Sequence, residues 1–309
     1  MAIESVAILG AGAVGSYFIW GLADLMKENL WVIAQGGRKE RLETEGLSIN
    51  HKKYRLHVRT PKEAHGADLL LVATKYGAIS GILDDIESIV DDHTIVMSLL
   101  NGVDSEQIIA GRIGAEHMIY SLIKIASERR GHEIIFDGDS TIGVSFGEKN
   151  QKKPSKRMEE IAALFSQTPL HYRMSPSIMQ DIWYKFAFNV SWNLPQAILG
   201  CGTGAFAVSE HLRTLRACLR EEVTAVAAAV GVDITEPSDI EKMRCPSKPA
   251  SRYSTLQDLD AGRHTEIEMF SGTIIRLGKH YGIPTPYNTF AYHAIRALEE
   301  KNDGKFDFS

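Results

Sequence analysis

Short apolar runs alternate with helical patterns along the first half of the chain. Residues 6–9, Val-Ala-Ile-Leu, form one such run and end on glycine, and a helical pattern follows from Val14 to about Met26. A second run at 30–34 comes directly afterwards, so the chain opens with strand, helix and strand, which is the unit that joins two parallel strands by a right-handed crossover. Further apolar runs predict strands over 68–74, 94–99 and 118–122. Because these runs do not alternate with polar residues, we expect helices on both faces of a parallel sheet.

Two more apolar runs, 134–136 and 141–144, flank Asp137-Gly138-Asp139 and predict a hairpin that closes the sheet with antiparallel strands. After Ser175-Pro176 the pattern is helical almost throughout. Helices are predicted over 154–165, 177–199, 212–230, 251–281 with a break near Gly262, and 289–300. We therefore predict an α/β domain over residues 1–175 and a helical domain over residues 176–309.

The composition and charge of the chain indicate what kind of protein it is and what kind of partner it binds. The 309 residues are 44% apolar and 24% charged, as in ordinary folded proteins. The net charge of −5 offers no general attraction for nucleic acid or anionic membranes, so we expect a small-molecule partner. Cys201, Cys218 and Cys245 are widely spaced and predict reduced thiols rather than disulfides. An acidic residue near the N-terminus and the absence of an apolar run of about 18 residues predict a cytoplasmic protein.

A glycine motif follows the first predicted strand. Gly10-Ala11-Gly12-Ala13-Val14-Gly15 reads G-x-G-x-x-G and opens the first predicted helix, which is the context in which this motif binds a dinucleotide. The first glycine permits a tight turn, the second lets the backbone approach a pyrophosphate, and the third allows the helix and strand to pack closely. We therefore assign Gly10, Ala11, Gly12, Ala13, Val14 and Gly15 to cofactor binding.

The end of the second predicted strand bears on the choice between NAD(H) and NADP(H). This stretch reads Ala34-Gln35-Gly36-Gly37-Arg38 and lacks the carboxylate that usually binds the 2′-hydroxyl of NAD. We expect no carboxylate here to repel a 2′-phosphate, and Arg38 is a candidate to attract one, which favours NADPH. Lys39 and Arg41 could act similarly or simply be solvated at the start of a helix.

Polar residues in both halves are candidates for the chemistry. Lys75 and Asn101 follow two predicted parallel strands, and the carboxyl ends of such strands face the ligand crevice, although both are also ordinary strand and turn terminators. Lys185, Asn189 and Asn193 lie at i, i+4 and i+8, on one side of an otherwise apolar helix. Such a stripe must find polar partners or face a wet cleft, because an unpaired buried polar group costs about 1 to 3 kcal/mol.

The whole chain resembles the ketopantoate reductases (2-dehydropantoate 2-reductases). The shared residues are Gly10-x-Gly12-x-x-Gly15, Lys75, Asn101-Gly102, Trp183-x-Lys185 with Asn189 and Asn193, Ser254-x-x-Gln257-Asp258, Gly262-Arg263-x-Thr265-Glu266-Ile267, and Gly282-Ile283-Pro284-Thr285-Pro286. The resemblance implies a Rossmann domain followed by a helical domain. It also implies NADPH-dependent reduction of 2-dehydropantoate to pantoate, in pantothenate and coenzyme A biosynthesis.

The resemblance also implies roles for single residues. Lys185 would donate the proton, and Glu266 would be its carboxylate partner and a substrate contact. The remaining implied contacts are Asn101, Asn189 and Asn193 as hydrogen-bonding partners of the substrate, Ser254 at the substrate carboxylate, Lys75 and Asn101 near cofactor and substrate, and Gln35 and Arg38 at the cofactor. We expect Lys75, Asn101, Lys185 and Glu266 to line one cleft between the domains.

Three departures from the family pattern leave alternatives open. Gln35 stands where the family has arginine, Pro195 lies one position later than usual, and Ile79 replaces a polar residue, so a reductase of another 2-oxo acid is one alternative. A non-catalytic NADP(H)-sensing protein is a second. Gly143-Val144-Ser145-Phe146-Gly147 matches the G-x-S-x-G motif of hydrolases, but a polar loop rather than a helix follows it, so we expect the match to be accidental. The histidine spacing predicts no metal site, and the oligomeric state stays open, with a homodimer as the simplest candidate.

Overall fold

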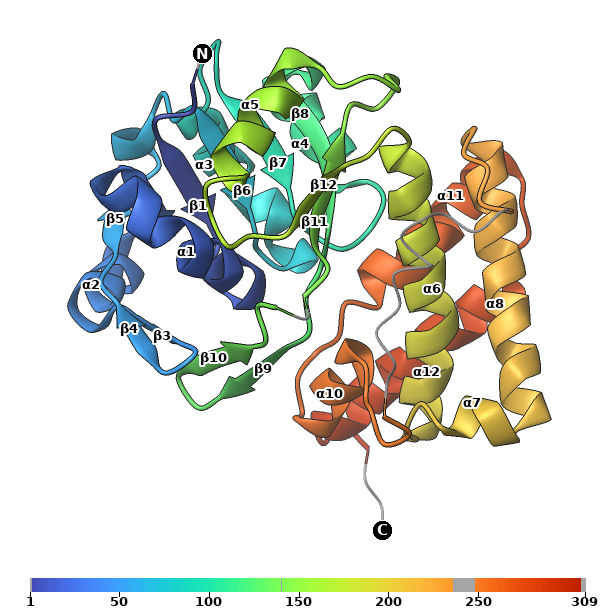
Figure 1. Cartoon of the computed structure of the whole chain (residues 1–309). Helices are drawn as coiled ribbons and strands as arrows, with labels where there is room; N and C mark the ends of the chain where they lie inside the picture. Colours follow the sequence, from blue (N-terminus) through green and yellow to red (C-terminus); the bar gives the residue numbers. More distant parts are fainter. Residues whose placement is uncertain (1, 140, 236–247, 307–309) are drawn as a thin grey trace. The chain divides into compact units, whose positions relative to one another are not determined.

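In the computed structural model, which describes residues 2–139, 141–235 and 248–306, the chain forms two compact units, Met1–Met179 and Gln180–Ser309 (Figure 1). The first unit contains an eight-stranded sheet with the order β12-β11-β8-β7-β6-β1-β2-β5. Its strands are β1 (Val6–Leu9), β2 (Leu30–Ile33), β5 (His57–Arg59), β6 (Leu69–Val72), β7 (Ile95–Ser98), β8 (Met118–Lys124), β11 (Gly143–Gly147) and β12 (Tyr172–Met174).

The strand order reverses at β1, which lies between β2 and β6 and is parallel to both. β7 is parallel to β6, so β1, β6 and β7 end side by side at the same edge of the sheet. Doubly wound sheets bind ligands outside the carboxyl ends of their strands, at such a reversal. The topology therefore places the segments after β1, β6 and β7 together.

Helices cover both faces of this sheet. The helices of the first unit are α1 (Ala13–Met26), α2 (Gly36–Glu45), α3 (Leu83–Ile89), α4 (Ser105–Ile113) and α5 (Lys156–Phe165). On one face, Val6 and Ile8 of β1 join an apolar cluster with Phe18 of α1 and Phe165 of α5, whose rings lie 5.9 Å apart. On the other face, α3 packs on α4, and α4 packs on β7 and β8. The predicted cover of helices on both faces is confirmed (Figure 1).

The predicted hairpin is wrong, because its first strand belongs to a second, smaller sheet. Its order is β4 (Lys52–Tyr54), β3 (Leu47–Ile49), β10 (Glu133–Phe136) and β9 (Ser127–Arg130). β10 pairs with β9 and β3, whereas β11 pairs antiparallel with β8 in the main sheet. The segment around Gly138 instead leads from one sheet to the other, and the Phe136 ring packs edge-on against Trp20 of α1, 5.5 Å away.

The second unit is helical within its described residues. Its helices are α6 (Ile178–Leu199), α7 (Ala205–Val208), α8 (Glu210–Ala229), α10 (Ser254–Asp260), α11 (Thr273–Tyr281) and α12 (Pro286–Asn302). The predicted break near Gly262 is confirmed, since α10 ends at Asp260 and Gly262 has φ +63°. Gly231 follows α8 with φ +83°, as a helix-terminating glycine does. Cys245 lies outside the described residues. The predicted fold class, a Rossmann-type domain followed by a helical domain, is confirmed.

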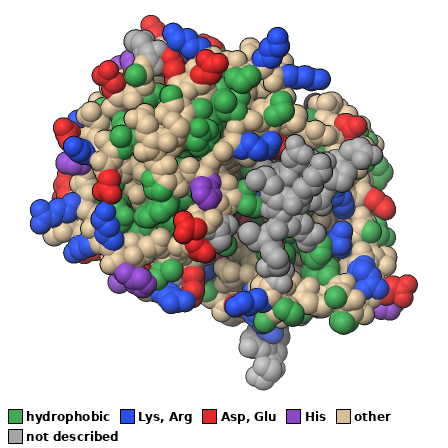
Figure 2. Space-filling model, in the orientation of Figure 1, with side chains coloured by type: hydrophobic (Ala, Val, Ile, Leu, Met, Phe, Trp, Pro, Cys, Tyr) green, Lys and Arg blue, Asp and Glu red, His purple; other side chains and the backbone are tan. Residues whose placement is uncertain are grey.

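The surface carries charges of both signs. On the face in Figure 2, basic and acidic side chains of the described residues are interspersed rather than gathered into one basic field. Within the ranges that the structure describes, none of the helices has the length and apolar character needed to span a membrane.

Candidate functional site

The three glycines of the motif occupy different surroundings in the turn between β1 and α1. Gly10 has φ +111°, and a Cβ there would lie 2.6 Å from the carbonyl oxygen of Ala73. A Cβ on Gly15 would lie 1.9 Å from the carbonyl oxygen of Gly10. Gly12, in contrast, is exposed and has open space on its Cβ side. Gly12 is the N-cap residue of α1 and has no side chain that could occupy the helix N-terminus. The turn therefore fits a pyrophosphate there.

Lys75 and Asn101 follow the two neighbouring strands β6 and β7. Lys75 is exposed at the start of the 3₁₀ helix Tyr76–Ile82, and Asn101 is half-buried. Tyr76 donates a hydrogen bond to Asp104 Oδ2 at 2.8 Å and thereby ties the two segments together. The hydroxyl of Thr74, beside Gly10, is buried without a hydrogen-bond partner in the described part of the chain. The topology thus brings Lys75, Asn101 and the glycine turn to one edge of the sheet.

A buried carboxyl lies close to Asn101 in the sequence, in the first turn of α4. Glu106 is 3% exposed and accepts a hydrogen bond from the Ser105 hydroxyl at 2.9 Å, which in turn lies 2.8 Å from the Ser98 hydroxyl. Burial raises the pKa of Glu106 to about 7, against the lowering effect of hydrogen bonds from its own backbone, Ser105 and Ser121.

A carboxylate that the sequence does not predict lies beside Gln35, which follows β2. Gln35 Nε2 donates to Asp85 Oδ1 at 2.8 Å, and Asp85 comes from α3. The expectation that no carboxylate lies near this position is therefore wrong, because an acid 50 residues away in the sequence reaches it. Burial is the largest influence on Asp85 and raises its pKa, whereas the Gln35 hydrogen bond lowers it.

Of the three cations near the end of β2, Lys39 is already engaged. Its ammonium lies 2.7 Å from Glu63 Oε2, and this contact and hydrogen bonds from Thr60 lower the pKa of Glu63 to about 2. Arg38 is exposed in the first turn of α2, beside the open space at Gly36 and Gly37. Arg38 is therefore a better candidate than Lys39 to meet an anion.

The polar stripe of the second unit lies on α6. Lys185 and Asn189 are half-buried, whereas Asn193 is only 3% exposed. Asn193 Oδ1 is buried and has no hydrogen-bond partner among the described residues. Around the stripe, Phe188 and Trp192 stack with their ring centres 5.6 Å apart. A buried amide oxygen in this state is suited to accept a hydrogen bond from a ligand or a water molecule.

Gln196, three residues after Asn193 on α6, forms hydrogen bonds with the segment that leads to Ser254. Its Nε2 donates to the Ser251 carbonyl at 3.1 Å, and its Oε1 accepts from the Tyr253 backbone N–H at 2.7 Å. Gln196 is fully buried. This pair of bonds fixes Ser254, the exposed first residue of α10, relative to α6. A lone glutamine in an apolar helix gave no sequence signal for this role.

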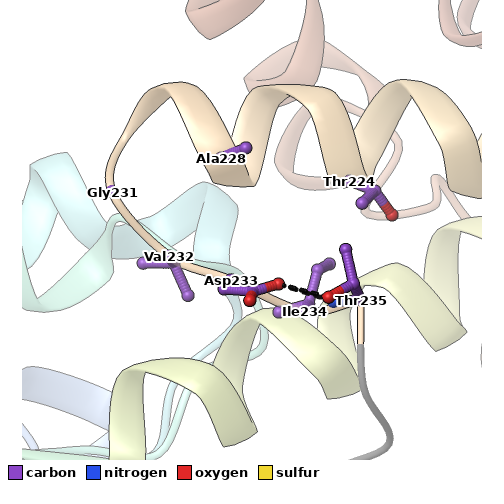
Figure 3. A pocket seen from close by; sticks show the side chains of 7 residues that line it. All are labelled: Thr224, Ala228, Gly231, Val232, Asp233, Ile234 and Thr235. Atoms are coloured by element: carbon purple, nitrogen blue, oxygen red, sulfur yellow. Dashed lines mark hydrogen bonds between the residues drawn. The ribbon is translucent and has the colours of Figure 1, made fainter.

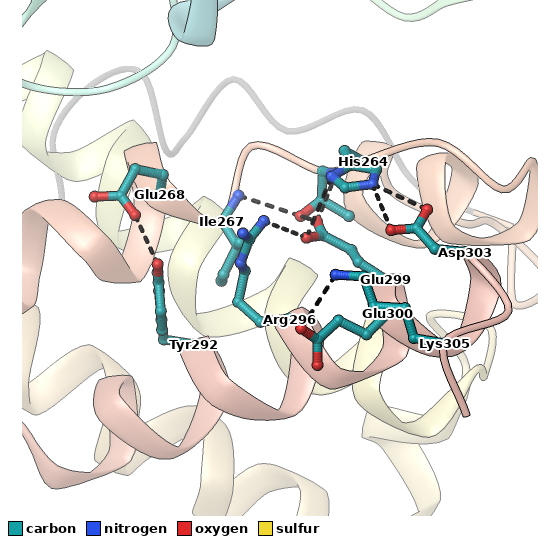
Figure 4. A network of polar contacts seen from close by, with 10 residues as sticks. His264, Ile267, Glu268, Tyr292, Arg296, Glu299, Glu300, Asp303 and Lys305 are labelled. Carbon is teal, nitrogen blue, oxygen red and sulfur yellow. Dashed lines mark hydrogen bonds and ion pairs between the residues drawn. The ribbon is translucent and has the colours of Figure 1, made fainter.

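Glu266 lies two residues before the π-helix that leads into α11. The Thr265 backbone N–H and hydroxyl both donate to Glu299 Oε1 at 2.7 Å, and the Thr265 oxygen accepts from the Ile267 N–H at 3.2 Å. Glu299 is 1% exposed and also accepts from Arg296 at 2.7 Å (Figure 4). The bonds on either side of half-buried Glu266 therefore fix its backbone. The π-helix Glu268–Gly272 follows directly.

A hollow of about 200 Å³ lies elsewhere in the second unit, at the end of α8 (Figure 3). Thr224 and Ala228 of α8 and residues 231–235 line it. None of the predicted catalytic, substrate-binding or cofactor-binding residues belongs to this lining. In it, Asp233 accepts hydrogen bonds from the backbone and hydroxyl of Thr235.

The hydrolase-like motif has no catalytic geometry. Residues 143–147 form strand β11, and Ser145 within it is 2% exposed. A nucleophile elbow requires an exposed serine between a strand and a helix. The expectation that the G-x-S-x-G match is accidental agrees with this placement.

Comparison with known proteins gives two matching family models. Ketopantoate reductase PanE/ApbA matches residues 6–149, and its C-terminal counterpart matches residues 177–299. Among curated relatives, 2-dehydropantoate 2-reductase of Mesorhizobium japonicum is 27% identical, over 95% of this chain and 97% of the relative. The Archaeoglobus fulgidus enzyme of the same name is 25% identical, over 97% and 99% of the two chains.

Solved structures agree across the whole chain. A PanE/ApbA family ketopantoate reductase from Ralstonia eutropha has a TM-score of 0.81 at 26% identity, covering 97% of this chain and 99% of its own. D-mandelate dehydrogenase with NADH and anilino(oxo)acetate has a TM-score of 0.82 at 25% identity, with the same coverage. The two family models, which lie on the two units in order, and these full-length relatives show that the chain is an NAD(P)-dependent oxidoreductase of the ketopantoate reductase family.

Proposed function

We propose that this protein reduces 2-dehydropantoate to pantoate with NADPH, in the biosynthesis of pantothenate and coenzyme A. The observation that carries the proposal is the polar stripe of α6. Lys185 and Asn189 are half-buried, and Asn193, four residues beyond Asn189, has a buried Oδ1 without a hydrogen-bond partner among the described residues. A reductase needs such an arrangement, because a 2-oxo acid presents a carbonyl oxygen and a carboxylate that require a proton donor and hydrogen-bonding partners.

The first unit would hold the cofactor. Gly10, Gly12 and Gly15 fit a pyrophosphate at the start of α1, and Arg38 is the candidate partner of the 2′-phosphate. When bound, the reduced nicotinamide supplies a hydride to the carbonyl carbon of the substrate. Lys75 and Asn101 lie at the same edge of the sheet as the glycine turn and would contact cofactor and substrate there.

Lys185 is the proposed acid. Negative charge builds on the carbonyl oxygen as its π electrons become a lone pair, and the Lys185 ammonium gives that oxygen a proton and then takes one back from water. Lysine has a reference pKa of about 10.4 and is charged at neutral pH. Glu266 is the proposed carboxylate partner of Lys185, and Ser254 the proposed contact of the substrate carboxylate. That Lys75, Asn101, Lys185 and Glu266 line one cleft stays a prediction.

A second candidate substrate class is a 2-oxo acid other than 2-dehydropantoate. The resemblance to D-mandelate dehydrogenase at 25% identity supports this candidate, and so does Ile79, which is 6% exposed where the family has a polar residue. Oxidation of NADPH should therefore be followed against a panel of 2-oxo acids that includes 2-dehydropantoate and an aryl 2-oxo acid. A preference for the aryl acid would overturn the assignment to 2-dehydropantoate.

The Lys185→Ala variant separates an enzyme from a nucleotide sensor. General acid catalysis contributes about 10²–10⁴-fold, so we expect kcat to fall by at least that lower bound while NADPH still binds. Asn189→Ala, four residues along the same stripe, is the matched control and should mainly raise KM. Retention of more than about a third of kcat in Lys185→Ala would refute the role of Lys185, and no turnover of any 2-oxo acid by the unaltered protein would favour a sensor.

A further inference from the structure

The carboxylate of Asp85 is hydrogen-bonded to Gln35, the residue at the position where Rossmann domains recognise the adenosine ribose. In such domains an acid at the end of the second strand binds the 2′-hydroxyl of NAD. Here the corresponding residue is Gln35, which caps α2 and donates through Nε2 to Asp85 Oδ1 at 2.8 Å. The acid thus comes from the first turn of α3 instead of from the strand.

The charge of Asp85 is not neutralised by an ion pair within the described residues. Its neighbour Asp84 lies 2.7 Å from Arg112 Nη2, whereas Asp85 accepts a hydrogen bond from the neutral amide of Gln35. Lys39, a cation of α2, is held 2.7 Å from Glu63. Asp85 is also half-buried, so water screens its charge less than that of Asp84, whose side chain is 87% exposed.

We propose that Asp85, positioned by Gln35, is a specificity-determining residue that lowers the preference of this protein for NADPH over NADH. The proposal rests on the proposed function in one respect, the binding of the nucleotide by the first unit. A negative charge beside the ribose opposes the 2′-phosphate of NADPH, with which Arg38 would pair, but it leaves the 2′-hydroxyl of NADH unopposed. Asp85 and Arg38 therefore act in opposite directions on one phosphate.

Asp85→Asn removes the charge and keeps an oxygen that can accept from Gln35. A unit charge within about one Debye length of a doubly charged phosphate, in largely aqueous surroundings, changes affinity by ~5-fold. We therefore expect the Kd of NADPH to fall by ~5-fold in 0.05 M salt and the Kd of NADH to change less than twofold. In 0.5 M salt the gain should shrink, because the Debye length falls well below its value of about 10 Å at 0.1 M.

Asp84→Asn is the matched control, since it makes the same change of charge one residue away. It should leave both constants within about twofold, and Arg38→Ala should weaken NADPH alone. The titrations use the full chain without a 2-oxo acid, and thermal unfolding checks that each variant is folded. Asp85→Lys provides a second variant, which should tighten NADPH further.

Equal effects of Asp84→Asn and Asp85→Asn, or an Asp85→Asn effect shared by both nucleotides, would overturn the proposal. Failure of the proposed function looks different. A chain that binds both nucleotides but reduces no 2-oxo acid would overturn the proposed activity. The effect of Asp85 could still be measured as the ratio of the Kd values of NADPH and NADH. A chain that binds neither nucleotide would overturn both.

Discussion

The buried carboxyl of Glu106 should make the stability of this protein depend on pH in the neutral range. Its pKa is about 7 in the folded chain, against 4.5 for an unburied glutamate. Between these values the folded chain holds a proton that the unfolded chain has released, so the free energy of unfolding falls as pH rises. The contribution of Glu106 is fully present below pH 4.5 and is lost as pH rises through 7.

The size of this effect follows from the two pKa values. One pKa unit corresponds to about 1.4 kcal/mol, so a difference of 2.5 units amounts to ~3 kcal/mol between pH 4.5 and pH 8. Glu106→Gln keeps an oxygen that can accept from Ser105 at a similar position but cannot ionise. We expect the variant to lack this part of the pH dependence and to be more stable than the unaltered protein at pH 8.

The assay is urea unfolding of both proteins at intervals from pH 5 to pH 8.5, with the difference between them plotted against pH. Infrared spectra should also show a protonated carboxyl band in the unaltered protein at pH 6 that fades by pH 8.5 and is missing in the variant. Glu116→Gln, at an exposed acid of the same unit, is the control and should change neither readout. A difference between Glu106→Gln and the unaltered protein that stays flat across this range would refute the reasoning.

Three further predictions concern the scaffold of the site. Gly15→Ala should destabilise the protein by more than ~2 kcal/mol, since its Cβ would lie 1.9 Å from a carbonyl oxygen, whereas Gly12→Ala should fold normally and weaken nucleotide binding; thermal unfolding and nucleotide titration separate the two. Gln196→Leu should cost ~1–3 kcal/mol for each backbone group left unpaired and raise KM for the 2-oxo acid, with an unchanged Kd for NADPH. Glu299→Ala should lower both stability and kcat, whereas Glu299→Gln, which can still accept from Thr265, should recover much of kcat; equal kcat values in the two variants would contradict the positioning of Glu266.

The elements that could be predicted from the sequence are those in which local pattern and final packing agree. The apolar runs at β1, β6 and β7 are buried on both faces, and Gly10, Gly12 and Gly15 each occupy the surroundings that their spacing indicates. The predicted hairpin failed because a turn signal does not say which strands pair. The run at 134–136 pairs with β9 and with β3, and its Phe136 ring packs on Trp20 of α1, more than a hundred residues earlier.

The same limit applies to the candidate site. Lys185, Asn189 and Asn193 could be found because their spacing repeats with the helix. Asp85 and Glu299 could not, since each bonds to a residue distant in sequence. An acid in the first turn of a helix, such as Asp85, is also an ordinary stabilising feature. Long-range contacts of single polar residues leave no periodic trace in one sequence.

The π-helix after Glu266 constrains how this family member can gain or lose residues. Its wide turn, in which the Gly272 N–H donates to the Ile267 carbonyl at 3.1 Å, holds one more residue than an α-helical turn would. Deleting one residue between 268 and 272 would let this wide turn close to the regular winding of an α-helix, so α11 would keep nearly the same rotation relative to Glu266. The side chains within the turn would change places, and the buried bond from Ser271 to Asn288 of α12 would be lost. A single-codon deletion here should therefore be better tolerated by the fold than one in the middle of α11 or α12, and its cost should fall on the contacts of the turn itself.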